Sequence, residues 1–387
     1  MGMIAGEPQA TKPGRRSWGL RALIGLGVTA AAFAVWVGAH HVRQQPPPPL
    51  FTEASLPPPP PSAENGWMMV SESRAVHDAP SFPPELVTLL DPARAEGPLL
   101  DQARAKREAL AVFVGSREAK DALSVLEKGI AMPRFADSCS LRPEPACILM
   151  PLMKVHRVAA LEALRRGVDG DWPGALSLSA RLTRADVDAA TSSRTLLAHL
   201  IAIADLRLGL DVSAALLEGY IQARGEGAAP LDSATTEALR AADAALGAMD
   251  PGALSARRAV TAEYVKTRAL IEEAETAYLP ALPLSSALLL DKVATIEGLN
   301  DRFSELAARV ATPSASPPGA AAPPEAEPEP WPEGTSWWTY NAAGKQVLSL
   351  MSLQWDPQLR KLEVERARIE AARTRAREAA RAVLQGS

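Results

Sequence analysis

The sequence is poor in the residues that build β-strands. Phe, Trp and Tyr together make up 5% of the 387 residues, while Ala, Leu, Arg and Glu dominate. Aromatic and β-branched side chains favour strands, whereas these four residues are good helix formers. The sequence therefore predicts an all-α fold, in the form of an irregular antiparallel helical bundle or hairpin array.

A strong excess of charge of either sign is also lacking. The formal net charge is −4, and no segment carries an unbroken basic run. A protein that binds a polyanion through its backbone needs a concentrated basic surface. The composition therefore predicts no nucleic-acid partner.

No motif of a known catalytic, cofactor or metal site occurs. HExxH, GxSxG, GxGxxG and the phosphate-binding Walker loop are all missing. The five histidines are His40, His41, His77, His156 and His199. Each is interpreted as a surface residue or a hydrogen-bonded core residue. We predict no catalytic, cofactor-binding or metal-ligating residue and no cofactor, which favours a protein that is not an enzyme.

Only two cysteines are present, Cys139 and Cys147. The polar loop between them is too long for a redox motif and does not have zinc-site spacing. In an oxidising compartment, such a close pair predicts a disulfide. Closing this short loop contributes roughly 2.5 kcal/mol in the chain-entropy model.

One long uncharged run stands near the N-terminus. Residues 22–39 carry no charge and would form a helix of about 27 Å, close to the thickness of a hydrocarbon core. Arg15, Arg16 and Arg21 precede it, opposed only by Glu7. The positive-inside rule then predicts a single-pass inner-membrane anchor, with residues 1–21 in the cytoplasm and the rest periplasmic or otherwise extracytoplasmic.

A cleaved signal peptide is the alternative for this segment. Val37-Gly38-Ala39 fits a small-residue cleavage pattern, and Arg15-Arg16 loosely resembles a twin-arginine signal. The apolar run is longer than a usual signal core. Both interpretations export the remainder of the chain.

A proline-rich linker is predicted for residues 40–66. It contains the runs Pro46–Pro49 and Pro57–Pro61. Such a composition favours an extended polyproline II course rather than a packed core. We expect it to act as a semi-rigid stalk that holds the body away from the membrane.

Residues 67–311 are predicted to form the all-helical exported domain. Apolar residues recur there at helical spacing between Gly and Pro breaks, which indicates six to eight helices once some segments merge. The predicted segments are 99–114, 117–131, 148–167, 173–184, 191–208, 211–224, 232–247, 254–277 and 286–311.

A second linker, rich in Pro, Ala and Glu, is predicted for residues 312–335. Residues 336–387 are expected to pack back onto the helical domain and to contain a last helix over 357–384. That helix carries eight basic and four acidic residues. Its charge fits either an anionic partner or a solvated helix with i,i+4 pairs. Leu359, Leu362, Ile369 and Ala376 are expected to form an apolar stripe that faces the core.

Two stretches resemble tetratricopeptide-type helical hairpins. They are Gly170–Leu176 and Asp121–Gly129, in which Asp or Pro would start a helix and small residues would let two helices approach closely. The Ala-Leu pairs in them begin at Ala122 and Ala175, 53 residues apart, which does not match a 34-residue repeat. Irregular helix pairs are therefore favoured over a regular solenoid.

Residues 67–387 also resemble a family of bacterial exported, membrane-anchored, all-helical proteins. Its motifs match here at Gly170, Asp171, Ala175 and Leu176, and then at Asn341, Gly344 and Lys345, although Ala342 stands where the family has proline. The resemblance implies that the C-terminal segment shares one fold with the central helices. It implies no biochemical activity.

These features favour a membrane-tethered periplasmic interaction or scaffold module that binds another envelope protein in grooves between helices. The first alternative is a cell-wall enzyme, which would need a deep pocket with converging carboxylates or a His–carboxylate pair. The second is a carrier of lipid or another hydrophobic ligand, which would need an enclosed apolar cavity of several hundred Å³.

Overall fold

The fold is helical throughout the part of the chain described here. The computed structural model describes residues 27–32, 34–35, 38, 46–56, 58–90, 97–139, 149–225, 227, 229–249, 254–273, 291–311 and 342–386. Within these ranges the only β-type pairing is an isolated bridge between Asn65 and Arg134. The predicted all-α fold is therefore confirmed.

The elements divide into short N-terminal helices and longer central and C-terminal ones. The short ones are η1 (Glu53–Ser55), η2 (Ser62–Glu64), α2 (Gly66–Ser71), α3 (Arg74–His77), α4 (Pro84–Val87), η3 (Thr88–Leu90), α5 (Leu99–Ala105) and α6 (Arg107–Gly115). The longer ones are α7 (Arg117–Ile130), α8 (Met150–Val168), α9 (Trp172–Ser192), α10 (Leu196–Gly225), α11 (Ser233–Ala248), α12 (Arg257–Glu272), α15 (Lys292–Ala311) and α16 (Ala342–Gly386).

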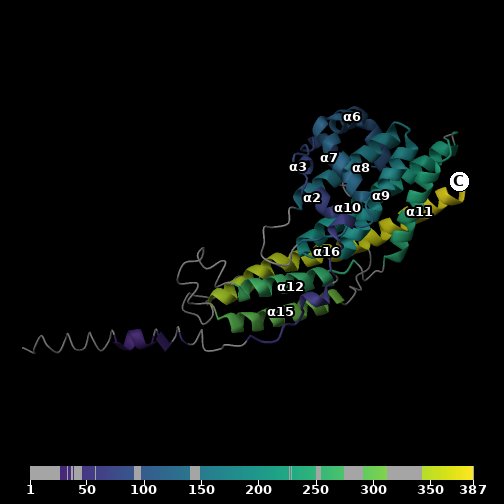
Figure 1. Ribbon diagram of the computed structural model, residues 1–387. Helices are drawn as coiled ribbons and strands as arrows, with labels where there is room; N and C mark the ends of the chain where they lie inside the picture. Colours follow the sequence, from purple (N-terminus) through teal and green to yellow (C-terminus); the bar gives the residue numbers. More distant parts are fainter. Residues whose placement is uncertain are drawn as a thin grey trace, which may run out of the picture.

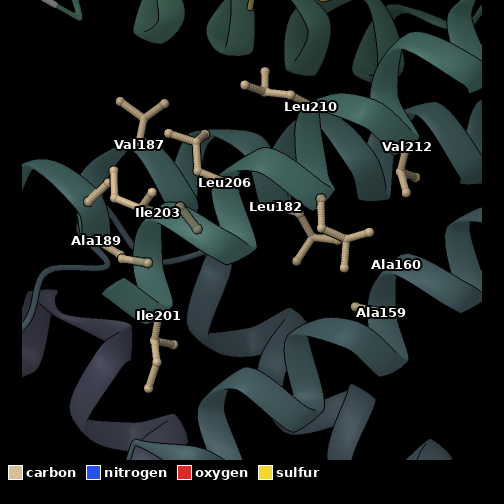
Figure 2. Packing of buried hydrophobic residues seen from close by; sticks show 14 of the residues in the cluster. Ala159, Ala160, Leu182, Val187, Ala189, Ile201, Ile203, Leu206, Leu210 and Val212 are labelled. Carbon is tan, nitrogen blue, oxygen red and sulfur yellow. The ribbon is translucent and has the colours of Figure 1, made fainter. Parts of the chain in front are cut away.

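Helices α8, α9 and α10 form the centre of the body. Figure 2 shows apolar side chains from these helices gathered in one core, among them Ala160, Leu182 and Leu206. All three are at most 2% exposed. Helix α10 lies against α8, α9 and α16, which explains why its sequence is apolar over most of its circumference.

The turn between α8 and α9 follows the predicted hairpin pattern. Gly170 has a φ of +82°, which a residue with a Cβ adopts at a cost. Asp171 then caps α9, since its side chain accepts a hydrogen bond from Gly174 N at 3.0 Å. The other hairpin-like stretch differs, because Ser116 rather than Asp121 begins α7 and accepts from Ala119 N.

The predicted break between 191–208 and 211–224 is wrong, because α10 runs unbroken through Gly209. A Cβ added at Gly209 would lie 2.7 Å from Asp186 Oδ2 on α9. This glycine therefore permits close helix packing and does not end a helix. In the same way α9 continues past its predicted end at residue 184 to Ser192, whereas the predicted helix 99–114 is divided at Lys106.

The C-terminal helix α16 extends along the molecule from beside α12 and α15 to the end of the body near α11 (Figure 1). It begins at Ala342, well before the predicted start at Pro357, so the helix continues through this proline. Leu362, Ile369 and Ala376 are at most 2% exposed, which confirms the apolar stripe at these three positions, whereas the side chain of Leu359 lies outside the described part.

Several arginines of α16 pair with acidic residues of the body. Arg377 Nε lies 2.8 Å from Asp243 Oδ1 on α11, and Arg375 Nη2 lies 3.2 Å from Asp211 Oδ1 on α10. Arg373 Nε donates to the carbonyl of Leu246 at 2.9 Å. These arginines therefore help to dock α16.

No helix within the described ranges is both long and apolar enough to cross a membrane. Of the predicted span 22–39, only residues 27–32, 34–35 and 38 are described, and these are helical. The transmembrane helix is thus not supported by the structure and stays a prediction.

The predicted stalk, residues 40–66, does not project freely where it is described. Leu50 N donates to Tyr264 Oη at 2.8 Å, and Leu56 is 7% exposed in contact with Ala262 on α12. Asn65 is fully buried and donates to the carbonyl of Ala136 at 2.8 Å. The stalk prediction is therefore corrected, because hydrogen bonds and buried side chains hold this proline-rich segment on the body.

Candidate functional site

The most unusual polar group of the interior joins three helices. His156 of α8 places its Nε2 2.9 Å from Asp186 Oδ2 of α9, and its Nδ1 3.7 Å from Asp205 Oδ1 of α10. The three residues are between 4% and 7% exposed. Charged groups are rarely buried so fully unless they are paired, so these side chains depend on one another.

The proton affinity of this cluster is shifted upward. Burial disfavours the charged imidazolium, but the negative charges of Asp186 and Asp205 outweigh it and raise the pKa of His156 to about 9. Burial also raises the pKa of Asp205 to about 7, with Asp186 adding to the rise and His156 opposing it. The cluster therefore holds a proton on His156 at neutral pH.

A small cavity of about 30 Å³ adjoins this cluster, lined also by Trp67 and Leu152. Within the described part of the chain, Trp67 Nε1 and His156 Nδ1 are buried without a hydrogen-bond partner. The volume is enough for one or two water molecules. The cluster can thus store a proton and bind a very small polar molecule, but a substrate of several non-hydrogen atoms does not fit.

A second and larger hollow is open to solvent. It has a volume of about 460 Å³ and lies between α9, the C-terminal end of α11 and residues 133–135. We call it the α9–α11 groove. Its apolar lining includes Phe135, Val187, Ala245, Ala248 and Met249.

Polar contacts hold the rim of the α9–α11 groove. Arg134 forms a bidentate salt bridge with Asp188, in which Nη2 lies 2.8 Å from Oδ1 and Nε lies 3.1 Å from Oδ2. The bond to Asp188 and its charge raise the pKa of Arg134. Arg184 Nη2 donates to the carbonyls of Ile130 and Met132, both at 2.7 Å, at the end of α7.

The residues singled out from the sequence do not converge on one site. Cys139 is 2% exposed and its N–H donates to Asp137 Oδ1 at 2.8 Å. Cys147, His40 and His41 lie outside the described residues, as do all of residues 312–335, so the disulfide stays a prediction. Of the family motif, Gly344 and Lys345 lie in the first turn of α16, and Asn341 is not described.

The other histidines differ in their surroundings. His77 ends α3 and its Nε2 lies 3.0 Å from the carbonyl of Ser71. Burial lowers the pKa of His199 to about 4. His156 is a buried, hydrogen-bonded core residue, as one of the two interpretations of the histidines expects, and its two carboxylate partners come from other helices.

The sequence contains a weak signal for this cluster. Asp205 directly follows the apolar residues Ile201–Ala204 at a position of α10 that faces the core. An acidic residue on a buried face implies a partner. Nothing in the sequence shows, however, that His156 is that partner.

Comparison of the chain with protein-family models, with curated proteins and with solved structures found no match.

Proposed function

We propose that the chain is a membrane-tethered, periplasmic interaction module that binds a segment of another envelope protein in the α9–α11 groove. The tether is the span predicted for residues 22–39. The observation that supports binding is the groove itself, a hollow of about 460 Å³ that is open to solvent and has Phe135, Val187 and Met249, each 3% to 8% exposed, in its lining. Apolar concave surfaces of this size are typical of binding sites.

The rim favours a preorganised site. Arg134 is held by Asp188, and Arg184 by two carbonyls at the end of α7. Side chains that are already ordered lose little entropy when a partner binds. The expected occupant is a helical or extended segment whose apolar side chains fill the floor of the groove.

The alternative of a cell-wall enzyme has one feature in its favour, the His156–Asp186 pair. A reaction there would need space for a substrate beside the pair. The adjoining cavity measures about 30 Å³, against about 460 Å³ for the groove. Because this cavity is too small for a substrate, we infer that the cluster holds the helices together.

The alternative of a lipid carrier is less favoured for a different reason. Such a carrier encloses its ligand in an apolar cavity. The α9–α11 groove is open, and Arg134, Arg184 and Asp188 contribute to its lining. A charged, open rim suits a peptide segment better than an alkyl chain.

Site-specific photo-crosslinking in cells tests the proposal. A photoreactive residue at Ala248 in the groove is expected to give one discrete crosslinked product in envelope membranes. The matched control is Ala111, an exposed alanine of α6 that does not line the groove. Substitution of Ala245 by Trp should fill the groove and remove the crosslink from Ala248.

Two outcomes would count against a binding groove. One is equal crosslinking from Ala248 and Ala111, which would indicate random collisions. The other is an Ala248 crosslink that persists unchanged in the Ala245→Trp chain.

A further inference from the structure

A proline-rich segment of the chain lies against helices α12 and α15 and is bound there by its backbone. We call residues 46–56 the strap. Arg268 Nη2 of α12 donates to the carbonyl of Pro47 at 2.8 Å, and Asn300 Nδ2 of α15 donates to the carbonyl of Pro48 at 3.2 Å. Tyr264 Oη accepts from the N–H of Leu50 at 2.8 Å. Two helices thus bind three backbone groups within residues 47–50.

The three side chains that bind the strap also bind one another. Tyr264 is fully buried, and its hydroxyl donates to Asn300 Oδ1 at 2.6 Å. Arg268 Nη1 donates to the same hydroxyl at 3.2 Å, while Arg268 Nε donates to Glu272 Oε1 at 2.8 Å. The site is therefore organised by contacts within the body, with the Tyr264 hydroxyl at its centre.

The pattern of donors and acceptors matches a proline run. Proline has no N–H, so a run of prolines offers only carbonyls for backbone hydrogen bonds. Arg268 and Asn300 supply a donor for each of two such carbonyls, and Tyr264 accepts from Leu50, the first N–H after Pro49. The extended course of the run is preformed, which lowers the entropy lost on binding.

An aromatic contact adds to these bonds. The ring of Phe51 meets the ring of Tyr264 edge to face, with centroids 5.5 Å apart and planes at 90°. By contrast Pro46, Pro48, Pro49 and Leu50 remain exposed to solvent. This part of the strap is therefore held by a few hydrogen bonds and one ring contact. Because so few contacts hold it, we expect it to bind and release reversibly.

We propose that α12 and α15 form a docking site for an extended proline-rich segment, occupied in cis by residues 46–51 as a releasable clamp. The site recognises two successive proline carbonyls, the next free N–H and a following aromatic ring. A proline-rich peptide of the same pattern would compete for it. Release of the clamp changes how far the body can move from the N-terminal part of the chain.

The change in reach is large. The predicted membrane span ends at Ala39. While Pro47 is bound to the body, the chain between Ala39 and Pro47 can extend no more than about 25 Å. With residues 46–51 released, the next attachment is Leu56, which is buried against Ala262, and the tether then spans up to about 50 Å. This consequence rests on the proposed membrane tether, whereas the docking site itself does not.

Hydrogen exchange at the Leu50 amide, measured on the full chain, tests the clamp. In the unsubstituted protein we expect this amide to be protected, since it donates to the buried Tyr264 hydroxyl. Tyr264→Phe keeps the ring and removes that acceptor, and should speed exchange of Leu50 about tenfold. Tyr220→Phe is the matched control, because Tyr220 is equally buried and donates to the carbonyl of Ala229 at 3.1 Å.

A second variant acts from the side of the strap. Phe51→Ala removes the aromatic contact without altering α12 or α15, and should also raise exchange at Leu50. A fluorescent peptide with the sequence of residues 46–51 should then bind the Phe51→Ala chain more tightly than the unsubstituted chain. The doubly substituted Tyr264→Phe, Phe51→Ala chain should bind this peptide at least tenfold more weakly than the Phe51→Ala chain does.

The clamp is overturned if Leu50 in the unsubstituted chain exchanges at the rate of a free amide. It is also overturned if Tyr264→Phe and Tyr220→Phe affect Leu50 equally, or if the peptide binds none of the chains. None of these measurements involves a membrane or a partner in the α9–α11 groove. Failure of the clamp is therefore distinguishable from failure of the proposed function.

Discussion

His156 and Asp186 form a hydrogen-bonded ion pair, with 2.9 Å between Nε2 and Oδ2, that joins α8 to α9 inside the core. Asp205 of α10 faces the other ring nitrogen at 3.7 Å. One imidazole thus contacts the two neighbouring helices. The pair specifies how these helices meet, because any shift between them would leave a buried charge without its partner.

Removal of this imidazole should destabilise the fold strongly. His156→Ala leaves the carboxylates of Asp186 and Asp205 buried without a cation, which is expected to cost about 3–5 kcal/mol. Urea unfolding followed by circular dichroism measures this change. His77→Ala is the control, since His77 is only half-buried and should cost at most about 1.5 kcal/mol. Equal stability of the two variants would argue against a buried ion pair.

The stability of the protein should fall as the pH rises from about 6.5 through about 9. The folded chain holds a proton on His156 up to a pKa of about 9, whereas the unfolded chain releases it near 6.5. The stabilisation is complete below pH 6.5 and lost above pH 9, and it is on the order of 3 kcal/mol. Burial raises the pKa of Asp205 to about 7, so the free energy of unfolding also falls as the pH rises from the usual pKa of an aspartate to about 7.

Unfolding free energies at pH values of about 6, 7.5 and 9.5 check this dependence. The His156→Ala chain serves as the reference, because it lacks the group that binds the extra proton. Its stability should decline less over the same interval. A native chain as stable at the highest pH as at the lowest would contradict the assignment.

Gly209 should not tolerate a side chain. In Gly209→Ala the new Cβ would lie 2.7 Å from Asp186 Oδ2, so α9 and α10 must separate or the carboxylate must move, at a cost of about 1–3 kcal/mol. Gly115→Ala at the end of α6 is the control, since no atom lies within 4 Å of the added Cβ. It should change the free energy of unfolding by less than about 1 kcal/mol. Thermal unfolding of the two variants separates the outcomes.

Cys139 and Cys147 are predicted to be oxidised to a disulfide in the exported protein. Thiol titration in denaturant without reductant should detect no free thiol, and Cys147→Ser should expose one. Loss of the bond should lower the free energy of unfolding by roughly 2.5 kcal/mol. Detection of two free thiols in protein isolated from the envelope would remove this prediction.

The predicted topology has a direct test in cells. A tag at the C-terminus should be digested by protease added to intact spheroplasts, and the full-length chain should sediment with membranes. A soluble, shortened chain would instead indicate a cleaved signal peptide. A protected tag would contradict the orientation derived from Arg15, Arg16 and Arg21, and would make the disulfide implausible.

Local features of the sequence predicted a good part of the fold. The segments 117–131 and 232–247 correspond to α7 and α11 within a residue at each end, because apolar spacing and capping residues act over a few positions of one helix. The start of α9 after Gly170 and Asp171 follows from the same short-range chemistry. The apolar stripe of α16 is also a property of one helix.

Contacts between segments that are far apart in the chain could not be predicted from the sequence in the same way. The role of Gly209 as a contact point depends on Asp186, which belongs to another helix. The strap looked like a free stalk because its composition cannot form a core, yet Tyr264, Arg268 and Asn300 bind its carbonyls and N–H from more than 200 positions away.

The sequence by itself thus determined the helical character of the chain, the limits of helices such as α7 and α11, and the start of α9 at Asp171, since backbone hydrogen bonds and helix propensities act within a few residues. Only the tertiary structure decided that His156 meets Asp186 and Asp205, that the α9–α11 groove exists, and that the proline run lies on α12 and α15. Each of these depends on the position of one helix against another. That position is set by the combined packing of the core, to which no single stretch of sequence contributes enough to be recognised.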